Sequence, residues 1–309
     1  MRRQTINYND PKVREEVLIR QRKGIWTPEQ ISSFAKHFKL KPGICLLDAG
    51  CGFGYILRAY GPYCIPCGML VGFDIETKLL KTARTKATGE KLGQFSHFVT
   101  GDVHKLPFVN NSFNISIAHV LLCHLKQPER ALDEIIRVTR RGGCVAIFDN
   151  AIADIGGGWS NFLRPTIKQK VSNYELRLRT MRGRKILGKG DFRVGCYIAY
   201  WMEKRGLKNV DIRCNEKVYW IAPPYKSPTQ KIEYHKLKER LIEPYDTTTE
   251  EFKDSVKCMR KGGMDDLSIR KAIRRGREHH KIYHNAFRRG TLSYAASSGQ
   301  FWCTWGFKP

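Results

Sequence analysis

The segment from Leu46 to Tyr55 constrains the fold of this chain more than any other, because it joins an apolar run to a cluster of glycines. An unbroken apolar run is typical of a strand that is buried on both faces of a parallel sheet. Glycines after such a strand allow a tight turn and a close approach of the backbone to a ligand. We expect the turn to open into a helix whose first amide groups are free to bind that ligand. The glycines stand at alternate positions: Gly50, Gly52 and Gly54.

Two kinds of ligand-binding turn could be assigned to this segment, and the spacing of the glycines distinguishes between them. A dinucleotide-binding turn has the pattern G-x-G-x-x-G, which would require a third glycine at position 55. That position is Tyr55, and the pattern instead begins at Asp48 and reads D-x-G-x-G-x-G. A glycine-rich loop alone can also be an ordinary tight turn. The assignment therefore depends on the residues that follow.

The D-x-G-x-G-x-G pattern resembles motif I of the class I S-adenosylmethionine (SAM) methyltransferases. In that family the acid and carbonyl groups of the loop receive the ammonium group of the methionine moiety, and no pyrophosphate is bound. The resemblance implies that SAM is the cofactor. It also implies cofactor contacts from four residues of this segment: Asp48, Gly50, Cys51 and Gly52.

A second buried strand is predicted over 69–74, and it ends in an acid twenty residues past Gly54. Folds of the α/β class place the carboxylate that binds ribose hydroxyls at about this distance. In the methyltransferase family this acid holds both ribose hydroxyls of SAM, and the next residue packs on adenine. The resemblance therefore assigns Asp74 and Ile75 to the cofactor site.

A third strand, predicted over 95–100, leads into Gly101, Asp102 and Val103. These residues match the family's G-D-x element, whose Asp hydrogen-bonds the adenine amino group, and they are expected to contact the cofactor. The run 106–125 resembles the branch that contains quinone-biosynthesis and sterol C-methyltransferases. Asn114 departs from that branch, which usually carries Asp there, and we interpret the change as structural.

Strands that alternate with helices and end in acids predict an α/β fold with a doubly wound, mostly parallel sheet. The resemblance covers about 40–150 and implies seven strands, a Rossmann-like arrangement and helical cap insertions. Ligands of such sheets bind at the carboxyl ends of the strands, where Gly50, Asp74, Asp102 and His119 fall. Val210–Arg213 alternates as a strand, and 300–307 is interpreted as the antiparallel last strand.

Two histidines, His119 and His124, are the best-placed titratable groups for catalysis. They lie at the end of the predicted fourth strand and in the turn after it. Methyl transfer from a sulfonium is an in-line displacement, so alignment of donor and acceptor supplies much of the catalysis, and a base is needed only for an acceptor that loses a proton. Either histidine could be that base, and His119 is also a candidate cofactor contact.

The first 41 residues are predicted to be helical and to lie over the cofactor site, as the leading segment does in many members of the family. Thr27 is a helix N-cap with Pro28 at the first helical position and Gln30 at the capping-box position. Tyr8 and Trp26 are candidates to touch SAM, although packing is the alternative role for both.

The rest of the chain is predicted to complete the sheet and to add two insertions. Residues 151–190 contain a basic, helix-prone run, and 195–204 reads as a sheet-covering helix with Gly206 after its end. The expected parts are 1–41, the N-terminal segment; 42–150, the SAM-binding core; 151–190, a cap insertion; 191–227 and 300–309, the remainder of the sheet; and 228–299, a basic helical insertion.

The formal net charge of +26 comes from 55 Lys and Arg against 29 Asp and Glu. Residues 151–309 hold 33 of the basic and 16 of the acidic residues, so most of the excess lies outside the predicted core. A field of this sign favours anionic partners through steering and local concentration. A basic surface that faces only solvent is the alternative.

Three functions remain compatible with these patterns. The first, which we favour, is a methyltransferase acting on a small molecule, with the methylated atom undefined and an anionic acceptor compatible with the charge. The second is an RNA methyltransferase whose basic C-terminal half binds phosphates, although no RNA-binding module or stacking motif is visible. The third is a SAM-binding protein without catalysis. The sequence does not indicate an oligomeric state.

The ten cysteines, with no secretory signal before them, are expected to be reduced cytosolic thiols, which predicts a cytoplasmic protein. The pair Cys64 and Cys67 forms a C-x-x-C pattern, but a structural zinc site needs a second pair at a fixed spacing, so no metal is expected. No segment approaches the apolar length that a membrane span requires.

Overall fold

The computed structural model describes residues 26–151, 159–214, 218–242, 245–297 and 301–309. These residues form two compact units. Unit 1 contains 26–151, 192–214 and 301–309 of the described residues, and unit 2 contains 159–191, 218–242 and 245–297. Tyr8 and the first predicted helix lie outside the described residues.

Unit 1 is built on a seven-stranded sheet with the order β3-β2-β1-β4-β5-β10-β7. The five strands from β3 to β5 pair in parallel, and β10 pairs antiparallel with both β5 and β7. The fold class predicted from the sequence is therefore confirmed, including the antiparallel last strand. The strands are β1 Cys45–Ala49, β2 Met69–Asp74, β3 Ser96–Thr100, β4 Phe113–His119, β5 Thr139–Asn150, β7 Lys208–Cys214 and β10 Phe301–Phe307.

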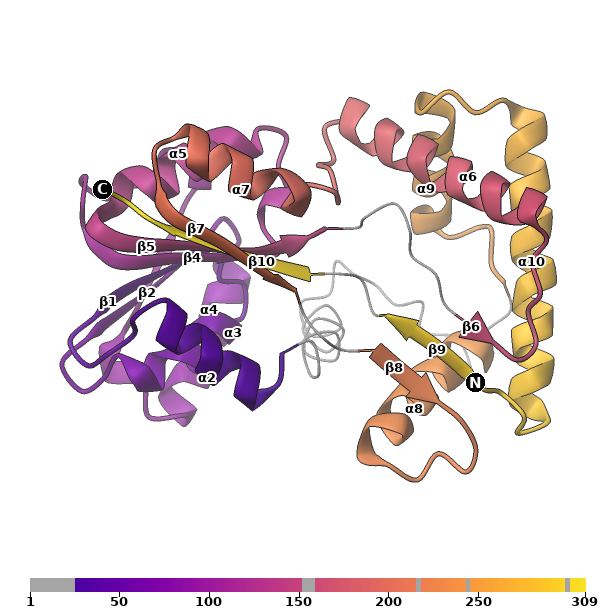
Figure 1. Cartoon of the computed structure of the whole chain (residues 1–309), viewed down its shortest axis with the longest axis horizontal. Coiled ribbons are helices and arrows are strands. Elements are labelled where there is room, and N and C mark those ends of the chain that lie inside the picture. The colour runs from indigo at the N-terminus through magenta and orange to yellow at the C-terminus, as the bar shows by residue number, and fades with distance from the viewer. Residues whose placement is uncertain (1–25, 152–158, 215–217, 243–244, 298–300) are drawn as a thin grey trace. The chain divides into compact units, whose positions relative to one another are not determined.

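Helices cover both faces of this sheet (Figure 1). One face carries α2, α3 and α4, and the other carries α5 and α7. Side chains of successive strand residues point to opposite faces, which is why both faces of a parallel strand are apolar. The helices are α2 Pro28–His37, α3 Tyr55–Tyr60, α4 Thr77–Gly89, α5 Pro128–Val138 and α7 Gly195–Lys204, with single 3-10 turns at Gly61–Tyr63, Gly93–Phe95, Val103–Lys105 and Leu122–His124.

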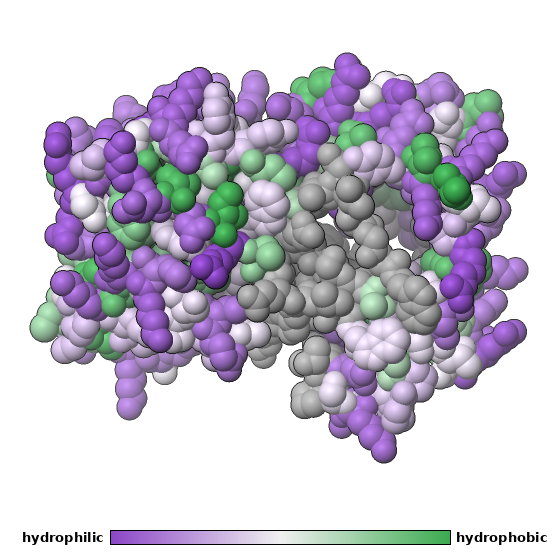
Figure 2. All heavy atoms as spheres, viewed as in Figure 1, coloured by the Kyte–Doolittle hydropathy of each residue, from purple (hydrophilic) through white to green (hydrophobic). Residues whose placement is uncertain are grey.

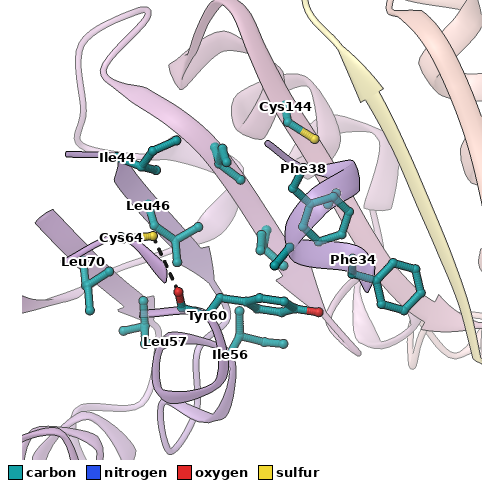
Figure 3. Close-up of a cluster of buried hydrophobic side chains, with 14 of the residues drawn as sticks. Phe34, Phe38, Ile44, Leu46, Ile56, Leu57, Tyr60, Cys64, Leu70 and Cys144 are labelled. Carbon is teal, nitrogen blue, oxygen red and sulfur yellow. Dashed lines mark hydrogen bonds between the residues drawn. The ribbon is translucent and has the colours of Figure 1, made fainter. Parts of the chain in front are cut away.

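The two cores of unit 1 divide the sheet residues between them. Leu46 packs with Phe34, Phe38 and Tyr60 in one core, whereas its neighbour Leu47 belongs to the core under α5 and α7. Figure 3 shows Phe34 and Phe38 of α2 beside Tyr60 of α3, whose carbonyl accepts a weak hydrogen bond from Cys64. These aromatic contacts fix α2 on the sheet, next to the glycine loop.

The start of α2 agrees with the sequence prediction. Thr27 is the N-cap, its hydroxyl accepts the amide of Gln30, and the Gln30 side chain accepts the amide of Thr27 in return. This reciprocal pair satisfies two helix-end amides.

The end of α5 leads directly into β5. The helix stops at Val138, and β5 begins at Thr139, so residues 140–143 are the irregular start of a long strand and not a separate turn. Gly142 has a φ of 72°, and the β4–β5 register shifts between Phe113 and Ile115. The two glycines at 142 and 143 are therefore part of the sheet.

Unit 2 combines four helices with a small antiparallel sheet of order β6-β9-β8. Because β8 pairs with β9, residues 218–227 group with this unit, and the main sheet loses the segment that we assigned to it beyond 215. The elements are β6 Trp159–Ser160, α6 Ile167–Ile186, β8 Val218–Ile221, α8 Pro228–Ile242, α9 Glu250–Lys261, α10 Asp266–Arg288 and β9 Tyr294–Ser297.

The surface reflects the high content of charged residues. Side chains on the face in Figure 2 are mostly hydrophilic, with small hydrophobic groups between them. Among the described residues, no helix has both the length and the apolar character needed to cross a bilayer.

Candidate functional site

The glycine loop leaves β1 in a conformation that favours glycine. Gly50, Gly52 and Gly54 have φ angles of 74°, 51° and 70°, all in the left-handed region, and Gly54 directly precedes α3. A Cβ atom on Gly50 would lie 2.7 Å from a methyl carbon of Leu121. The left-handed φ favours glycine at all three positions, and at Gly50 the Leu121 side chain restricts the space as well.

Asp74 holds this loop from the neighbouring strand. Its Oδ2 accepts the amide of Gly52 at 2.8 Å, and its Oδ1 accepts the amide of Glu76 at 2.9 Å. The carbonyl of Phe73 accepts the amides of Gly50 and Cys51 at 2.7 and 2.9 Å. The end of β2 and the glycine loop are therefore one hydrogen-bonded structure, and the structure brings the two predicted motifs together.

The third predicted element lies at the same edge of the sheet. Gly101 donates its amide to the carbonyl of Asp74 at 3.0 Å, and a Cβ atom on it would lie 2.7 Å from the ring of Phe73. The side chain of Asp102 is 60% exposed. Its Oδ1 accepts the backbone amide of His104 at 2.9 Å and the ring Nδ1 at 2.6 Å, and these bonds hold the pKa of Asp102 below its usual value.

The apolar residues beside these acids differ in exposure. Ile75, directly after Asp74, is 69% exposed. Val103 and Cys51 are buried. Asp48 is fully buried at the end of β1.

Trp26 and His119 form a buried pair although they are 93 residues apart. The indole Nε1 of Trp26 donates to Nε2 of His119 at 3.0 Å, and the imidazole ring lies against Phe148 and Tyr55. Since the Trp26 donor requires the lone pair of Nε2, the proton of a neutral His119 lies on Nδ1. The predicted cofactor contact Trp26 is thus part of the core and positions the histidine.

His124 has a different environment. It is exposed in the 3-10 turn Leu122–His124, and its ring meets the ring of Phe192 edge-on at 5.6 Å between centroids. The two histidines that the sequence grouped as candidate bases are therefore distinct: one is buried and hydrogen-bonded through Nε2, and the other is open to solvent.

Asp149 is the residue that sequence analysis missed. It is fully buried near the end of β5, where Oδ2 accepts the amide of Cys123 at 3.1 Å and Oδ1 accepts the amide of Asn150 at 2.8 Å. Burial raises the pKa of Asp149 to about 6. It thereby holds the turn that carries His124. A fourth acid at a strand end, after Asp48, Asp74 and Asp102, was the available signal.

The pKa of Asp149 gives a testable pH dependence. Because the folded pKa of about 6 lies above the usual 3.8, the fold favours the protonated carboxyl. That stabilisation is complete below about pH 4 and is lost as the pH rises through about 6. Asp149→Asn cannot titrate, so we expect the wild type to lose roughly 2–3 kcal/mol relative to this variant between pH 4 and pH 7. Urea unfolding across this range measures the difference, with Asp211→Asn on the exposed strand β7 as the control. Parallel curves for wild type and Asp149→Asn would contradict the prediction.

The hydrogen-bonding groups at the ends of these strands fit SAM, the cofactor that the sequence implies. SAM presents an ammonium group, two ribose hydroxyls and an adenine amino group, all of which are hydrogen-bond donors. The ends of β1, β2 and β3 carry three carboxylates as acceptors, Asp48, Asp74 and Asp102, beside the glycine loop, whose residues 51–54 are buried. Among the residues that the structure describes, no group of three or more His, Cys, Asp or Glu side chains could hold a metal ion.

Comparison with known proteins gives the same assignment. A family model described as a methyltransferase domain matches residues 47–147. An uncharacterized methyltransferase of Schizosaccharomyces pombe is 38% identical over 125 residues, which are 38% of this chain and 44% of that protein. A demethylmenaquinone methyltransferase of Lactobacillus johnsonii is 30% identical over 136 residues, 42% of this chain and 55% of the relative. A sterol 24-C-methyltransferase of Gibberella zeae is 31% identical over 125 residues, 39% of this chain and 31% of the relative. The chain therefore spans between 31% and 55% of the length of these curated relatives.

Solved structures confirm the fold. A methyltransferase candidate from Bacillus halodurans has a TM-score of 0.51 at 16% identity, and the match covers 91% of this chain and 99% of that one. The cyclase SpnF has the same TM-score at 17% identity, covering 91% and 81%. At such identities the likeness concerns the fold alone. Residues 47–147 are therefore similar to a methyltransferase domain, and the chain shares its fold with the solved methyltransferase candidate.

Proposed function

We propose that this chain is a SAM-dependent methyltransferase that acts on a small molecule. The observation that carries the proposal is the bond from Gly52 to Asp74, which joins the glycine loop to the acid of the next strand at 2.8 Å. This bond places the glycine loop and the carboxylate together at the carboxyl ends of parallel strands, where sheets of this kind bind their ligands.

The residues of the site have separate tasks in this proposal. When bound, SAM supplies an electrophilic methyl group on a sulfonium. Asp74 accepts hydrogen bonds from two ribose hydroxyls, and Asp102 accepts one from the adenine amino group. Ile75 covers a face of the adenine ring, and Asp48 with the loop of Gly50, Cys51 and Gly52 receives the ammonium group. Because this backbone is held by Phe73 and Asp74, the site is preorganised, and little ordering is required on binding.

The two histidines are proposed to differ in role. His119 is buried and accepts the Trp26 indole at Nε2, so it positions the end of β4 and presents its Nδ1–H as a hydrogen-bond donor. His124 is exposed in the next turn and is the candidate base for an acceptor that must lose a proton. Asp149 fixes this turn through the amide of Cys123.

The acceptor is proposed to be a small molecule because of the relatives. Two of them are named for demethylmenaquinone and sterol acceptors, and the quinone and sterol branch is also the one that the run 106–125 resembles. The positive charge of the chain favours an anionic compound, such as a carboxylate or a phosphate. The predicted cap role of 151–190 and 228–299 stays part of this proposal.

Incubation with methyl-labelled SAM tests the function and its alternatives. The full chain is supplied in parallel with a small-metabolite extract and with total RNA, and the label is located by chromatography. We expect label in a small molecule and none in RNA. Label in RNA would overturn the small-molecule proposal, and SAM binding without transfer to either pool would contradict catalysis. That last outcome is a real alternative, since a cyclase shares the fold.

A further inference from the structure

We propose that unit 2 contains its own binding site for a small carboxylate with an apolar body, centred on Arg275. The site is a cavity of about 230 Å³ that lies entirely within unit 2. The proposal does not depend on SAM binding or on methyl transfer.

The cavity is lined by residues of the helices α6, α9 and α10 and by Tyr245 in the loop before α9. The helix α10 contributes Ala272, Gly276 and His279, which lie four and three residues apart and so share one face. The positions of α6 and α9 are fixed by close backbone contact: a Cβ atom on Gly183 would lie 1.8 Å from the carbonyl oxygen of Cys258. The walls are therefore rigid, as a preformed site requires.

The polar side chains that line the cavity lack partners in the protein. Arg275 makes no hydrogen bond or ion pair with any residue that the structure describes, and its Nε is buried. Within the same described ranges, His279, Asn173 and the hydroxyl of Tyr245 also make no side-chain hydrogen bond. A buried guanidinium nitrogen without an acceptor is costly, so the Nε of Arg275 indicates a ligand that satisfies it, with three further polar side chains beside it in the cavity wall.

Arg275 stands apart from the other basic residues of α10. Arg274 is 77% exposed and lies 3.7 Å from Glu278, and Arg277 donates to the hydroxyl of Thr247. The general basic charge of the helix thus faces solvent or other polar groups, whereas Arg275 lines the cavity. A planar guanidinium matches a carboxylate in a two-point bond.

Tyr245 is placed for this site by a glycine. A Cβ atom on Gly276 would lie 2.4 Å from the Tyr245 hydroxyl oxygen, so only glycine allows the ring to approach α10 there. Glycine within a helix costs about 0.5–1 kcal/mol relative to alanine, so its presence needs a local reason. Burial raises the pKa of Tyr245, which keeps its hydroxyl a hydrogen-bond donor at neutral pH.

The remaining lining defines the body of the ligand. Leu176, Phe252, Met259 and Ile273 supply the apolar part of the cavity lining. At about 30 Å³ for each water-sized group, 230 Å³ corresponds to roughly eight non-hydrogen atoms. The cavity therefore suits carboxylates such as hexanoate or phenylacetate, in which one end is charged and the other is apolar.

Titration of the full chain by ligand-observed NMR tests this site. The probes are hexanoate and phenylacetate, each compared with its neutral amide, hexanamide and phenylacetamide. We expect saturable binding of at least one acid with a dissociation constant of about 1 mM or lower, and amide binding at least about tenfold weaker. Arg275→Gln should abolish the preference for the acid, whereas Arg274→Gln, on the exposed side of α10, should preserve it.

Two results would overturn the proposal. One is the absence of saturable binding of either acid to the wild type up to about 10 mM. The other is an unchanged acid preference in Arg275→Gln. Because Arg275 makes no bond within the described protein, this variant is expected to fold, and its melting temperature verifies that. SAM affinity measured on the same samples separates failure of this site from failure of the cofactor site.

Discussion

Asp74→Ala is expected to weaken SAM binding by roughly ten- to a hundredfold while unit 1 stays folded. The carboxylate is proposed to bind two ribose hydroxyls, and it also accepts the amides of Gly52 and Glu76. Loss of a charged hydrogen-bond partner has an effect of this size. Isothermal titration calorimetry of the full chain with SAM measures it.

Asp211→Ala is the matched control for this prediction. It removes an acid of the same size from the exposed strand β7, and SAM affinity is expected to change less than about twofold. Asp74→Asn should give an intermediate loss, because it keeps an oxygen for the Gly52 amide and removes the charge. Wild-type affinity in a folded Asp74→Ala variant would exclude Asp74 from the cofactor site.

His124→Ala is expected to lower kcat at least about a hundredfold on an acceptor that must lose a proton, with SAM affinity near the wild-type value. The reason is its position in the exposed turn after β4, which Asp149 holds through Cys123. His119→Ala should behave differently. It removes the acceptor of the Trp26 indole in a buried core, so lower stability and weaker SAM binding are expected.

His97→Ala controls for removal of an imidazole, since His97 is exposed on β3 and belongs to no proposed site. Its kcat should match the wild type. A decrease of less than about tenfold for His124→Ala would exclude this side chain as a base, and alignment of donor and acceptor would then be the main source of catalysis.

Much of unit 1 could be predicted because its signals are local. Gly50 must be glycine for reasons of its own backbone, and Asp74 follows a strand whose apolar run is visible in the sequence. The Thr27 cap likewise depends on residues within one helical turn. Each of these features depends on residues within one short segment, so the sequence pattern and spacing are sufficient to predict it.

Other features of the site depend on contacts between distant segments. The bond from Trp26 to His119 spans 93 residues, and the packing of Phe148 that supports it comes from a third segment. In the sequence, Asp149 is a single acid within an apolar strand. Only the fold shows that its carboxylate accepts the amide of Cys123 and so holds the turn that contains His124. Spacing along the chain carries no information on either contact.

Unit 2 was the least predictable part for the same reason. Its small sheet joins strands of two to four residues from three separate segments, and such short strands have no periodicity to detect. Arg275 is one basic residue among several on α10, and no sequence pattern distinguishes it from Arg274. Only the fold shows that it lines a cavity together with residues of α6, α9 and the loop before α9.

Hydrogen exchange of the full chain with and without SAM is the most direct measurement of where the cofactor binds. We expect slower exchange at the glycine loop and at the ends of β2 and β3, over residues 50–54, 74–76 and 101–104, with α6 and α10 of unit 2 as internal reference segments. Slower exchange confined to segments outside these three, or no change at saturating SAM, would contradict the central claim that the edge of the sheet at Gly52, Asp74 and Asp102 is the SAM site.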